Sequence, residues 1–263
     1  MTSTDQSTIN KNLNNAENFE SANNAEAMID SNSNIHVSNH PILSHKISIL
    51  RSSSTIPSSF RSGLREITFH LGYEATSNLK TKPVALTVPV GKSHLDYTGS
   101  TLSDKVALVP ILRSGLGMVD SMLELLPNAG VHHIGMYSKD MMPVQYYNRL
   151  PKKCDADVAY VLDPIIATAN TVLSVVGILK KWGVKKICIV SVIASKDGVQ
   201  KITSAFPDVQ ITLGMVDSGL TKDGQLLPGC GDAGDRLFGT PLIEDDEALL
   251  HPSKRRKYSM DEK

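Results

Sequence analysis

Apolar and polar positions follow two recurring patterns along this chain. Residues 58–76 carry Phe60, Leu64, Ile67 and Leu71 three or four positions apart, which predicts an amphipathic helix. Short continuous apolar runs are typical of strands that are buried on both faces of a sheet. Such runs predict strands at 105–112, 132–138, 157–163, 185–194 and 209–217.

Helical segments separate most of these predicted strands. They are expected at 117–127, 171–182 and 195–207, and a further strand is expected at 82–91. Strands that alternate with helices of about 10–15 residues build parallel βαβ units. The pattern therefore predicts an α/β fold with a doubly wound, mostly parallel sheet and helices on both faces. Ligands of such sheets bind at the carboxyl ends of the strands.

The two ends of the chain differ in composition from its centre. Residues 1–38 are rich in Asn, Ser, Thr and Ala, so they offer too little apolar surface to offset the entropy of ordering. We expect a disordered tail there, one α/β domain over 39–241, and a charged tail over 242–263. The basic run Lys254–Lys257 in that last tail fits a nuclear-import signal, and a solvated tail that balances the preceding acidic run is the alternative.

The bulk composition narrows the class of protein. The 263 residues include 27 basic and 27 acidic side chains, so charge gives no reason to expect nucleic acid or membrane as a partner. Cys154, Cys188 and Cys230 are scattered, without zinc-binding spacing or a disulfide framework. Neither a signal-peptide pattern nor an apolar run of about 18 residues is present. We therefore expect a cytoplasmic protein.

Two strand ends carry residues that suit a phosphorylated sugar. Arg113 follows the strand 105–112, and a guanidinium beside a tight turn can bind phosphate or pyrophosphate. Asp163 ends the next buried strand and can accept hydrogen bonds from sugar hydroxyls, while Thr168 and Thr171 open a helix whose N-terminus can take a phosphate. The alternatives are that Arg113 is a surface arginine that satisfies carbonyl groups, and that Thr168 or Asn170 merely caps the helix.

A third segment, "LPGCGDAGDRLFGT" at 227–240, is dense in glycine. Glycine lets the backbone approach a flat ligand closely and adopt positive φ. This composition favours a ligand-binding loop over its alternative, a glycine-rich surface turn.

Together these segments resemble the uracil phosphoribosyltransferase family. The likeness runs from about His40 to Thr240, with "HPILSHKISILR", "PILRSGLGMVDSMLELLP", "DPIIAT" and "PGCGDAGDRLFGT" among the blocks that match in family order. The resemblance implies the type I phosphoribosyltransferase fold. It also implies transfer of uracil to 5-phospho-α-D-ribose 1-diphosphate (PRPP), giving UMP and pyrophosphate. Magnesium would be bound mainly through PRPP and water, and the protein would form a homo-oligomer.

The resemblance also implies a role for individual residues. The expected catalytic residues are Arg113, Asp163 and Asp232. The residues expected to bind PRPP are Arg113, Asp163, Ala167, Thr168, Ala169, Asn170, Thr171 and Asp232. The residues expected to contact uracil, largely through their backbone, are Leu226, Gly231, Asp232 and Ala233.

The chain departs from the family pattern at three places. The phosphate loop reads D-P-I-I-A-T-A-N-T where the family usually has two glycines after A-T, and Ser77 and Ser138 stand where arginines are usual. A methyl group at Ala169 costs little if φ is negative and about 1–2 kcal/mol if the residue is left-handed. These departures concern the affinity for PRPP more than the recognition of uracil. They keep open an alternative, a weakly active or inactive paralogue that binds uracil, UMP or a related ligand in a regulatory or catabolic role.

Overall fold

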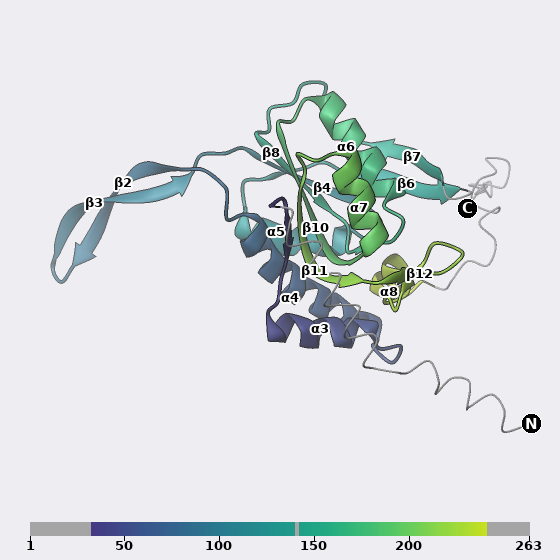
Figure 1. Cartoon of the computed structure of the whole chain (residues 1–263). Helices are drawn as coiled ribbons and strands as arrows, with labels where there is room; N and C mark the ends of the chain where they lie inside the picture. Colours follow the sequence, from purple (N-terminus) through teal and green to yellow (C-terminus); the bar gives the residue numbers. More distant parts are fainter. Residues whose placement is uncertain (1–32, 140–141, 241–263) are drawn as a thin grey trace, which may run out of the picture.

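The computed structural model describes residues 33–139 and 142–240 of the chain (Figure 1). The disorder expected for residues 1–32 and the charged tail with its basic run Lys254–Lys257 lie outside these described residues. Among the helices of the described part, none is both long and apolar enough to cross a membrane.

A mostly parallel sheet of nine strands forms the centre of the described structure. Its strands are β1 (Ile35–Val37), β4 (Val106–Leu112), β5 (Gly130–Val131), β6 (Ile134–Lys139), β7 (Met142–Asn148), β8 (Val158–Leu162), β9 (Ile165–Ile166), β10 (Lys186–Ser195) and β11 (Gln210–Asp217). The main path runs β1-β11-β10-β8-β4-β6-β7, and the β6–β7 pair is antiparallel while the other pairs are parallel. This architecture confirms the predicted doubly wound sheet.

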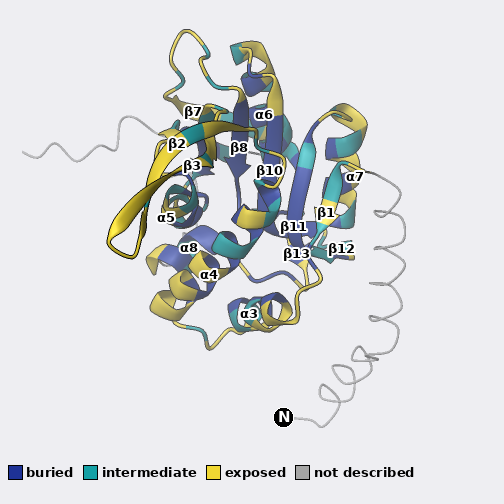
Figure 2. Ribbon diagram, turned by 90° about the vertical axis from the view of Figure 1, so that its left-hand side faces the viewer, coloured by how far each residue is buried: buried dark blue, intermediate teal, exposed yellow. Residues whose placement is uncertain are grey.

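Helices cover both faces of this sheet, as the sequence predicted. One face carries α3 (Pro41–Arg51), α4 (Pro57–Ala75), α5 (Leu116–Leu125) and α8 (Ala233–Phe238), and the other carries α6 (Asn170–Trp182) and α7 (Lys196–Ala205). Successive residues of a strand point to opposite faces, so Leu108 and Val109 of β4 join different hydrophobic clusters. The central strands are deeply buried between these helices (Figure 2).

The order of the strands creates a crevice at the carboxyl edge of the sheet. From β4 the chain crosses to β6 on one side and then returns to β8 on the other, so the winding reverses between β4 and β8. These two strands pair in parallel from Val106 with Val158 to Pro110 with Leu162. The helices that follow them diverge to opposite faces, which opens a crevice just beyond the strand ends. Arg113 and Asp163 are the residues that come directly after these two strands.

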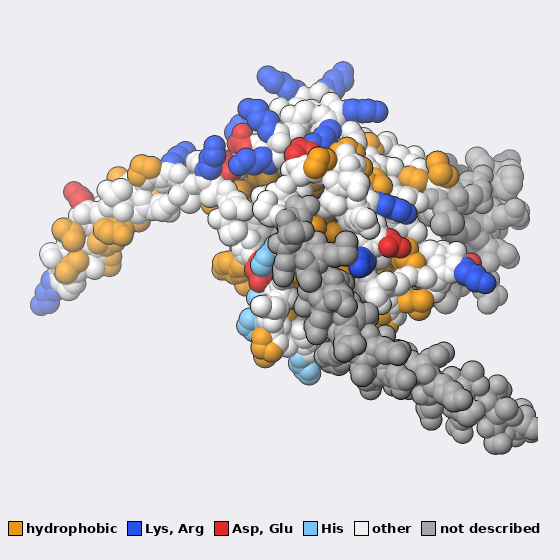
Figure 3. Space-filling model, viewed as in Figure 1, with side chains coloured by type: hydrophobic (Ala, Val, Ile, Leu, Met, Phe, Trp, Pro, Cys, Tyr) orange, Lys and Arg blue, Asp and Glu red, His pale blue; other side chains and the backbone are white. Residues whose placement is uncertain are grey.

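A long hairpin projects from the body of the molecule (Figure 1). It pairs β2 (Thr81–Val90) with β3 (Ser93–Leu102) in a separate two-stranded sheet. The predicted strand at 82–91 is therefore confirmed, although it lies outside the main sheet and its partner was not predicted. Hydrophobic side chains lie on the surface of this arm (Figure 3), and the large exposed ones are Leu86, Val90, Leu95, Tyr97 and Leu102.

The boundary expected for the N-terminal tail is wrong at its end. Residues 35–37 form β1, which pairs with β11 at the sheet edge. The next residue, Ser38, is buried; its backbone N–H donates to Leu213 at 2.8 Å, and its hydroxyl donates to Glu74 at 3.0 Å. The alternating pattern of Ile35 and Val37 fits a strand, but the Asn/Ser-rich composition of the whole tail masks so short a signal.

Candidate active site

The ends of β4 and β8 bring the residues predicted from two separate motifs into one crevice. The hydroxyl of Ser114, next to Arg113, donates a hydrogen bond to the Asp163 carboxylate at 3.2 Å. Gly115 makes this packing possible, since a Cβ at that position would lie 2.3 Å from the carbonyl oxygen of Leu162. The turn after β4 therefore rests directly on the end of β8.

Asp163 is a buried acid at the floor of this crevice, with 8% of its surface exposed. Burial raises the pKa of its carboxyl to about 7, and the negative charge of Asp232 adds to the rise. Hydrogen bonds from Ser114 and from the backbone N–H of Ile165 act in the opposite direction without cancelling it. A carboxyl that titrates near neutral pH and faces a crevice is typical of a functional site.

The loop from Asp163 to Thr171 is held by the neighbouring strand and helix. The hydroxyl of Ser195, at the N-terminus of α7, donates to the carbonyl of Ala167 at 2.5 Å. The next loop residues lead into α6, whose N-terminus carries the positive end of the helix dipole and suits a phosphate. The N-cap position belongs to Ala169, which has no capping side chain. This placement disfavours the alternative in which Thr168 or Asn170 serves only as the cap.

Ala169 adopts the left-handed conformation, with φ of 64°. The methyl group therefore carries the cost that the sequence left conditional, about 1–2 kcal/mol. The same methyl is buried, with 4% of the residue exposed, and packs into the hydrophobic cluster beneath α6 and α7. Burial of one methyl group returns on the order of 0.8 kcal/mol. The loop thus keeps the backbone shape that a glycine would adopt, at a small net cost.

The glycine-rich segment forms a loop that faces the same crevice. A short strand pair, β12 (Gly219–Leu220) with β13 (Leu226–Leu227), leads into it, and α8 follows it. Leu226 and Ala233 are buried at its two ends, whereas Gly231 and Asp232 are exposed between them. The carboxylate of Asp232 accepts a hydrogen bond from the backbone N–H of Asp235 at 2.8 Å and so caps α8. The four predicted uracil contacts therefore share one loop.

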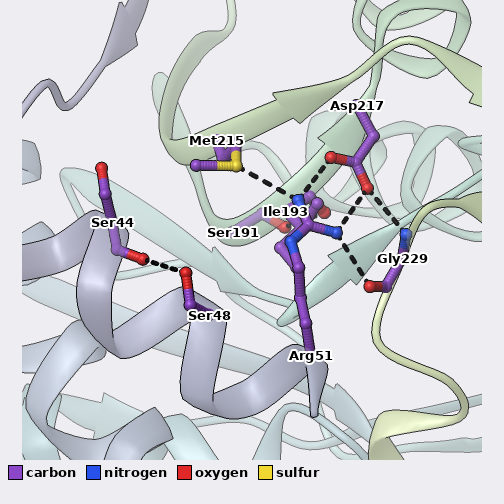
Figure 4. Close-up of polar contacts among 8 residues, drawn as sticks. All are labelled: Ser44, Ser48, Arg51, Ser191, Ile193, Met215, Asp217 and Gly229. Atoms are coloured by element: carbon purple, nitrogen blue, oxygen red, sulfur yellow. Dashed lines mark hydrogen bonds and ion pairs between the residues drawn. The ribbon is translucent and has the colours of Figure 1, made fainter. Parts of the chain in front are cut away.

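A half-buried arginine that the sequence interpretation missed anchors this loop (Figure 4). Arg51, the last residue of α3, donates to both carboxylate oxygens of Asp217 at 2.9 and 2.5 Å and to the carbonyl of Gly229 at 2.8 Å. The N–H of Gly229 donates in turn to Asp217 at 2.9 Å. Two signals were available in the sequence: Arg51 ends the first family block, and Asp217 ends a predicted buried strand.

A second arginine holds the other side of the loop. Arg236 of α8 donates to the carbonyls of Cys230 at 2.7 Å and Ser52 at 2.6 Å, and also to that of Leu50. Its guanidinium lies 4.5 Å from the ring centre of Phe60 in α4. The loop is thus fixed by α3 and α4 and does not depend on its own short helix alone.

The two serines that replace family arginines lie in very different places. Ser138 is exposed on β6, beyond Gly135, which pairs with Leu112 at the end of β4. It therefore lies at the carboxyl edge, beside the crevice, as predicted. Ser77 lines a hollow with His36 and with Gln210, the first residue of β11. That hollow is at the amino edge of the sheet, so Ser77 does not belong to the crevice. Its position therefore does not support the expectation that it affects PRPP binding.

The sequence matches the family model described as uracil phosphoribosyltransferase over residues 37–240. The chain belongs to the uracil phosphoribosyltransferase family. It is 43% identical over 208 residues to the uracil phosphoribosyltransferase of Roseiflexus sp. (strain RS-1), which covers 78% of this chain and 98% of that protein. The uracil phosphoribosyltransferase of Thermosipho melanesiensis is 43% identical over 209 residues, covering 78% and 99% of the two chains.

A solved structure supports the same fold. The AQ2163 protein from Aquifex aeolicus is 30% identical to this chain, with a TM-score of 0.73 over 80% of this chain and all of the other. Membership of the uracil phosphoribosyltransferase family thus agrees with the α/β phosphoribosyltransferase fold expected from the sequence. The loop from Asp163 to Thr171 and the loop from Leu226 to Ala233 both lie within the residues that the family model matches.

The conformation of Ala169 predicts how its substitution acts on stability. Ala169→Gly should change the free energy of unfolding by no more than about 1 kcal/mol, because relief of the left-handed strain is offset by the lost methyl burial and by the greater freedom of the unfolded chain. Ala169→Val should cost more than about 2 kcal/mol, since a β-branched residue is a true outlier at positive φ. Urea denaturation of the three proteins measures both effects. Equal stability of the alanine and valine proteins would contradict the left-handed assignment.

The raised pKa of Asp163 predicts a pH dependence of stability. Between about pH 4 and pH 7 this carboxyl is ionised in the unfolded chain but still protonated in the folded one, so the free energy of unfolding falls as pH rises. The total effect is on the order of 2–4 kcal/mol. Asp163→Asn should remove this part of the slope and make the ligand-free protein more stable at pH 7.5, as measured by denaturation at several pH values. A variant with the same slope as the wild type would show that Asp163 is charged in the folded state.

Proposed function

We propose that the chain is an active uracil phosphoribosyltransferase that joins uracil to PRPP and releases UMP and pyrophosphate. One observation supports this most directly: Arg113, Asp163 and the intact uracil loop converge on one crevice at the switch point of the sheet. The relatives named above carry the same activity in their names. Nothing among them favours the alternative of an inactive or catabolic paralogue.

In the proposed reaction, the bond between the anomeric carbon of ribose and the pyrophosphate oxygen breaks, and a bond from that carbon to N1 of uracil forms. Pyrophosphate leaves with the electron pair of the broken bond, and the N1 proton of uracil passes to the departing pyrophosphate or to solvent water. Positive charge develops on the ribose ring and negative charge on the leaving group. The half-exposed guanidinium of Arg113 lies at the end of β4, where it can stabilise the departing pyrophosphate. No covalent intermediate on the protein is required.

The remaining parts of the substrates have separate places in the crevice. The Asp163 carboxyl would bind the ribose hydroxyls, and residues 167–171 with the N-terminus of α6 would bind the 5-phosphate. Uracil is flat and uncharged, and the backbone N–H and C=O groups of the loop at Gly231–Ala233 can pair with its carbonyls and ring N–H groups. A charged side chain in that position would cost free energy to desolvate.

Magnesium fits this site as an ion that arrives with its substrate. Within residues 33–139 and 142–240, no group of three or more His, Cys, Asp and Glu side chains could hold a metal ion. Mg²⁺ commonly binds through one or two carboxylates together with substrate phosphates and water. Asp163 and Asp232, which lie close enough to interact electrostatically, are the carboxylates that could orient it through water. The bound ion would add positive charge beside the leaving pyrophosphate.

The proposed activity is tested directly with radiolabelled uracil, PRPP and Mg²⁺. We expect the wild-type protein to form UMP, and Arg113→Met to lower kcat/KM for PRPP at least a hundredfold, because the leaving group loses a charge-assisted hydrogen bond. Calorimetry with uracil and with UMP runs alongside. Binding of these ligands without formation of UMP would favour the regulatory paralogue.

The serine at position 138, where the family usually has arginine, predicts weaker binding of PRPP. An arginine at this position would offer a charge-assisted hydrogen bond worth roughly 1.5–3 kcal/mol. The wild-type KM for PRPP should therefore be about ten- to a hundredfold higher than in a family member that keeps the arginine. Ser138→Arg should lower this KM and leave the KM for uracil unchanged. The matched control is Ser77→Arg, which restores the other missing arginine at the opposite edge of the sheet and should alter neither KM. An equal effect of the two variants would contradict this account.

We also propose that the protein forms a homo-oligomer through the β2–β3 arm. A two-stranded hairpin is at best marginally stable alone in water, and this one exposes five large apolar side chains. Replacing residues 83–100 by a short Gly-Ser turn should convert the oligomer to monomer in sedimentation experiments while the main sheet keeps its helices and strands by circular dichroism. An unchanged mass per particle, relative to the wild type, would exclude the arm as the interface. The expected absence of nucleic-acid and membrane partners and the cytoplasmic location stay predictions.

A further inference from the structure

Arg113 is held from the side of the uracil loop. Its Nη2 donates to Oδ1 of Asp235 at 2.8 Å, and its Nη1 donates to the hydroxyl of Thr240 at 3.3 Å. The Thr240 hydroxyl donates to the same oxygen of Asp235 at 2.5 Å. Asp235 lies on α8, three residues after Asp232 in the uracil loop. One carboxylate oxygen therefore joins the arginine to the helix that carries the loop.

The two acids of the "GDAGD" segment have different partners. The carboxylate of Asp232 caps α8, and its negative charge acts on Asp163, the acid that we propose binds the ribose hydroxyls. The carboxylate of Asp235 faces Arg113 and is 18% exposed, whereas the guanidinium is 51% exposed. Burial alone would raise the pKa of Asp235, but the hydrogen bonds from Thr240 and Arg113 outweigh burial and hold this pKa below its usual value. Asp235 is therefore charged at neutral pH.

Gly234 leaves room for this arrangement. A Cβ at this position would lie 3.1 Å from Oδ1 of Asp232, which is tighter than ordinary contact, and 3.4 Å from Nη2 of Arg113, which is at the limit of ordinary contact. The guanidinium thus lies across α8 at the residue without a side chain. In this segment Asp232 caps α8, Ala233 buries its methyl group, Gly234 leaves room for the guanidinium and Asp235 binds it.

We propose that Asp235 is a positioning residue for the reaction, because it holds Arg113 against α8 and so joins the pyrophosphate-binding guanidinium to the uracil loop. This proposal rests on the proposed function and assigns a role to a residue that does not itself touch substrate. A guanidinium has five N–H donors, and Asp235 and Thr240 engage two of them. The other donors remain for pyrophosphate, so Asp235 does not have to leave. An arginine without this anchor would lose more side-chain entropy when it binds the ligand.

The deciding variant is Asp235→Asn, which keeps the shape of the side chain and the backbone N–H that Asp232 caps. We expect the KM for PRPP to rise about tenfold and the KM for uracil to change less than twofold. Collapse of the uracil loop, which is what a merely structural role predicts, would raise both constants. The matched control is Asp208→Asn, which removes the exposed partner of Lys180 far from the crevice and should change neither constant.

Gly234→Ala tests the positioning of Arg113 without changing the side chain of Asp235. Alanine is favoured over glycine in a helix, so the fold should be kept, but the added methyl should displace the guanidinium. The same selective rise in the KM for PRPP is expected. In the background of Arg113→Met, neither Asp235→Asn nor Gly234→Ala should have any further effect on that KM, because both act through the arginine.

Binding of magnesium pyrophosphate, measured by calorimetry, separates this proposal from the proposed function. A wild-type protein that makes no UMP would overturn the proposed function. Even then, weaker pyrophosphate binding by Asp235→Asn, lost in the Arg113→Met background, would support the positioning role. Three results would overturn the positioning role: equal rises in both KM values, an unchanged or lower KM for PRPP in Asp235→Asn, or an effect of Asp235→Asn that persists without Arg113.

Discussion

The parallel pairing of β4 with β8 is the constraint on which the site depends. These strands are separated by more than forty residues of sequence, which include α5 and the strands β5, β6 and β7. Because the winding reverses between them, the helices that follow these strands lie on opposite faces of the sheet, and the residues directly after the strands face a shared space. Arg113 and Asp163 acquire their neighbours from this pairing, and the hydrogen bond from Ser114 to Asp163 fixes how far apart they stand.

Most of the main sheet could be predicted because its strands are buried on both faces. Such strands read as continuous apolar runs, and all five predicted runs correspond to strands of the sheet. The elements that were missed lack this signal. β3 and β7 are largely exposed, so their side chains alternate without a core to enforce the pattern, and β1 is three residues long within an Asn/Ser-rich segment. Register and partner choice for such strands come from tertiary contacts.

The candidate site shows a similar limit. Arg113, Asp163 and Asp232 could be proposed because a strand end or a glycine-rich loop marks each of them in the sequence. The role of Arg51 was missed, because it comes from contacts with Asp217 and Gly229, which are far away in sequence. The family resemblance supplied the identity of the loops, but the anchoring of those loops appears only when helix, strand and loop are placed together.

The acidic residues around the crevice fall into two groups, those that hold the loops in place and those that are proposed to bind substrate. Asp217 and Asp235 each receive an arginine and further hydrogen bonds, and they fix neighbouring groups in place. Asp163 is buried, and this burial, together with the negative charge of Asp232, raises its pKa toward neutrality against the hydrogen bonds from one hydroxyl and one backbone N–H. A ligand that brings positive charge or hydroxyl donors would relieve this penalty, whereas the empty protein bears it as lost stability. Asp163, held by a hydroxyl and an N–H instead of an arginine, is thus well prepared to gain from the substrate, and the acids that bind arginines hold the surrounding loops in place.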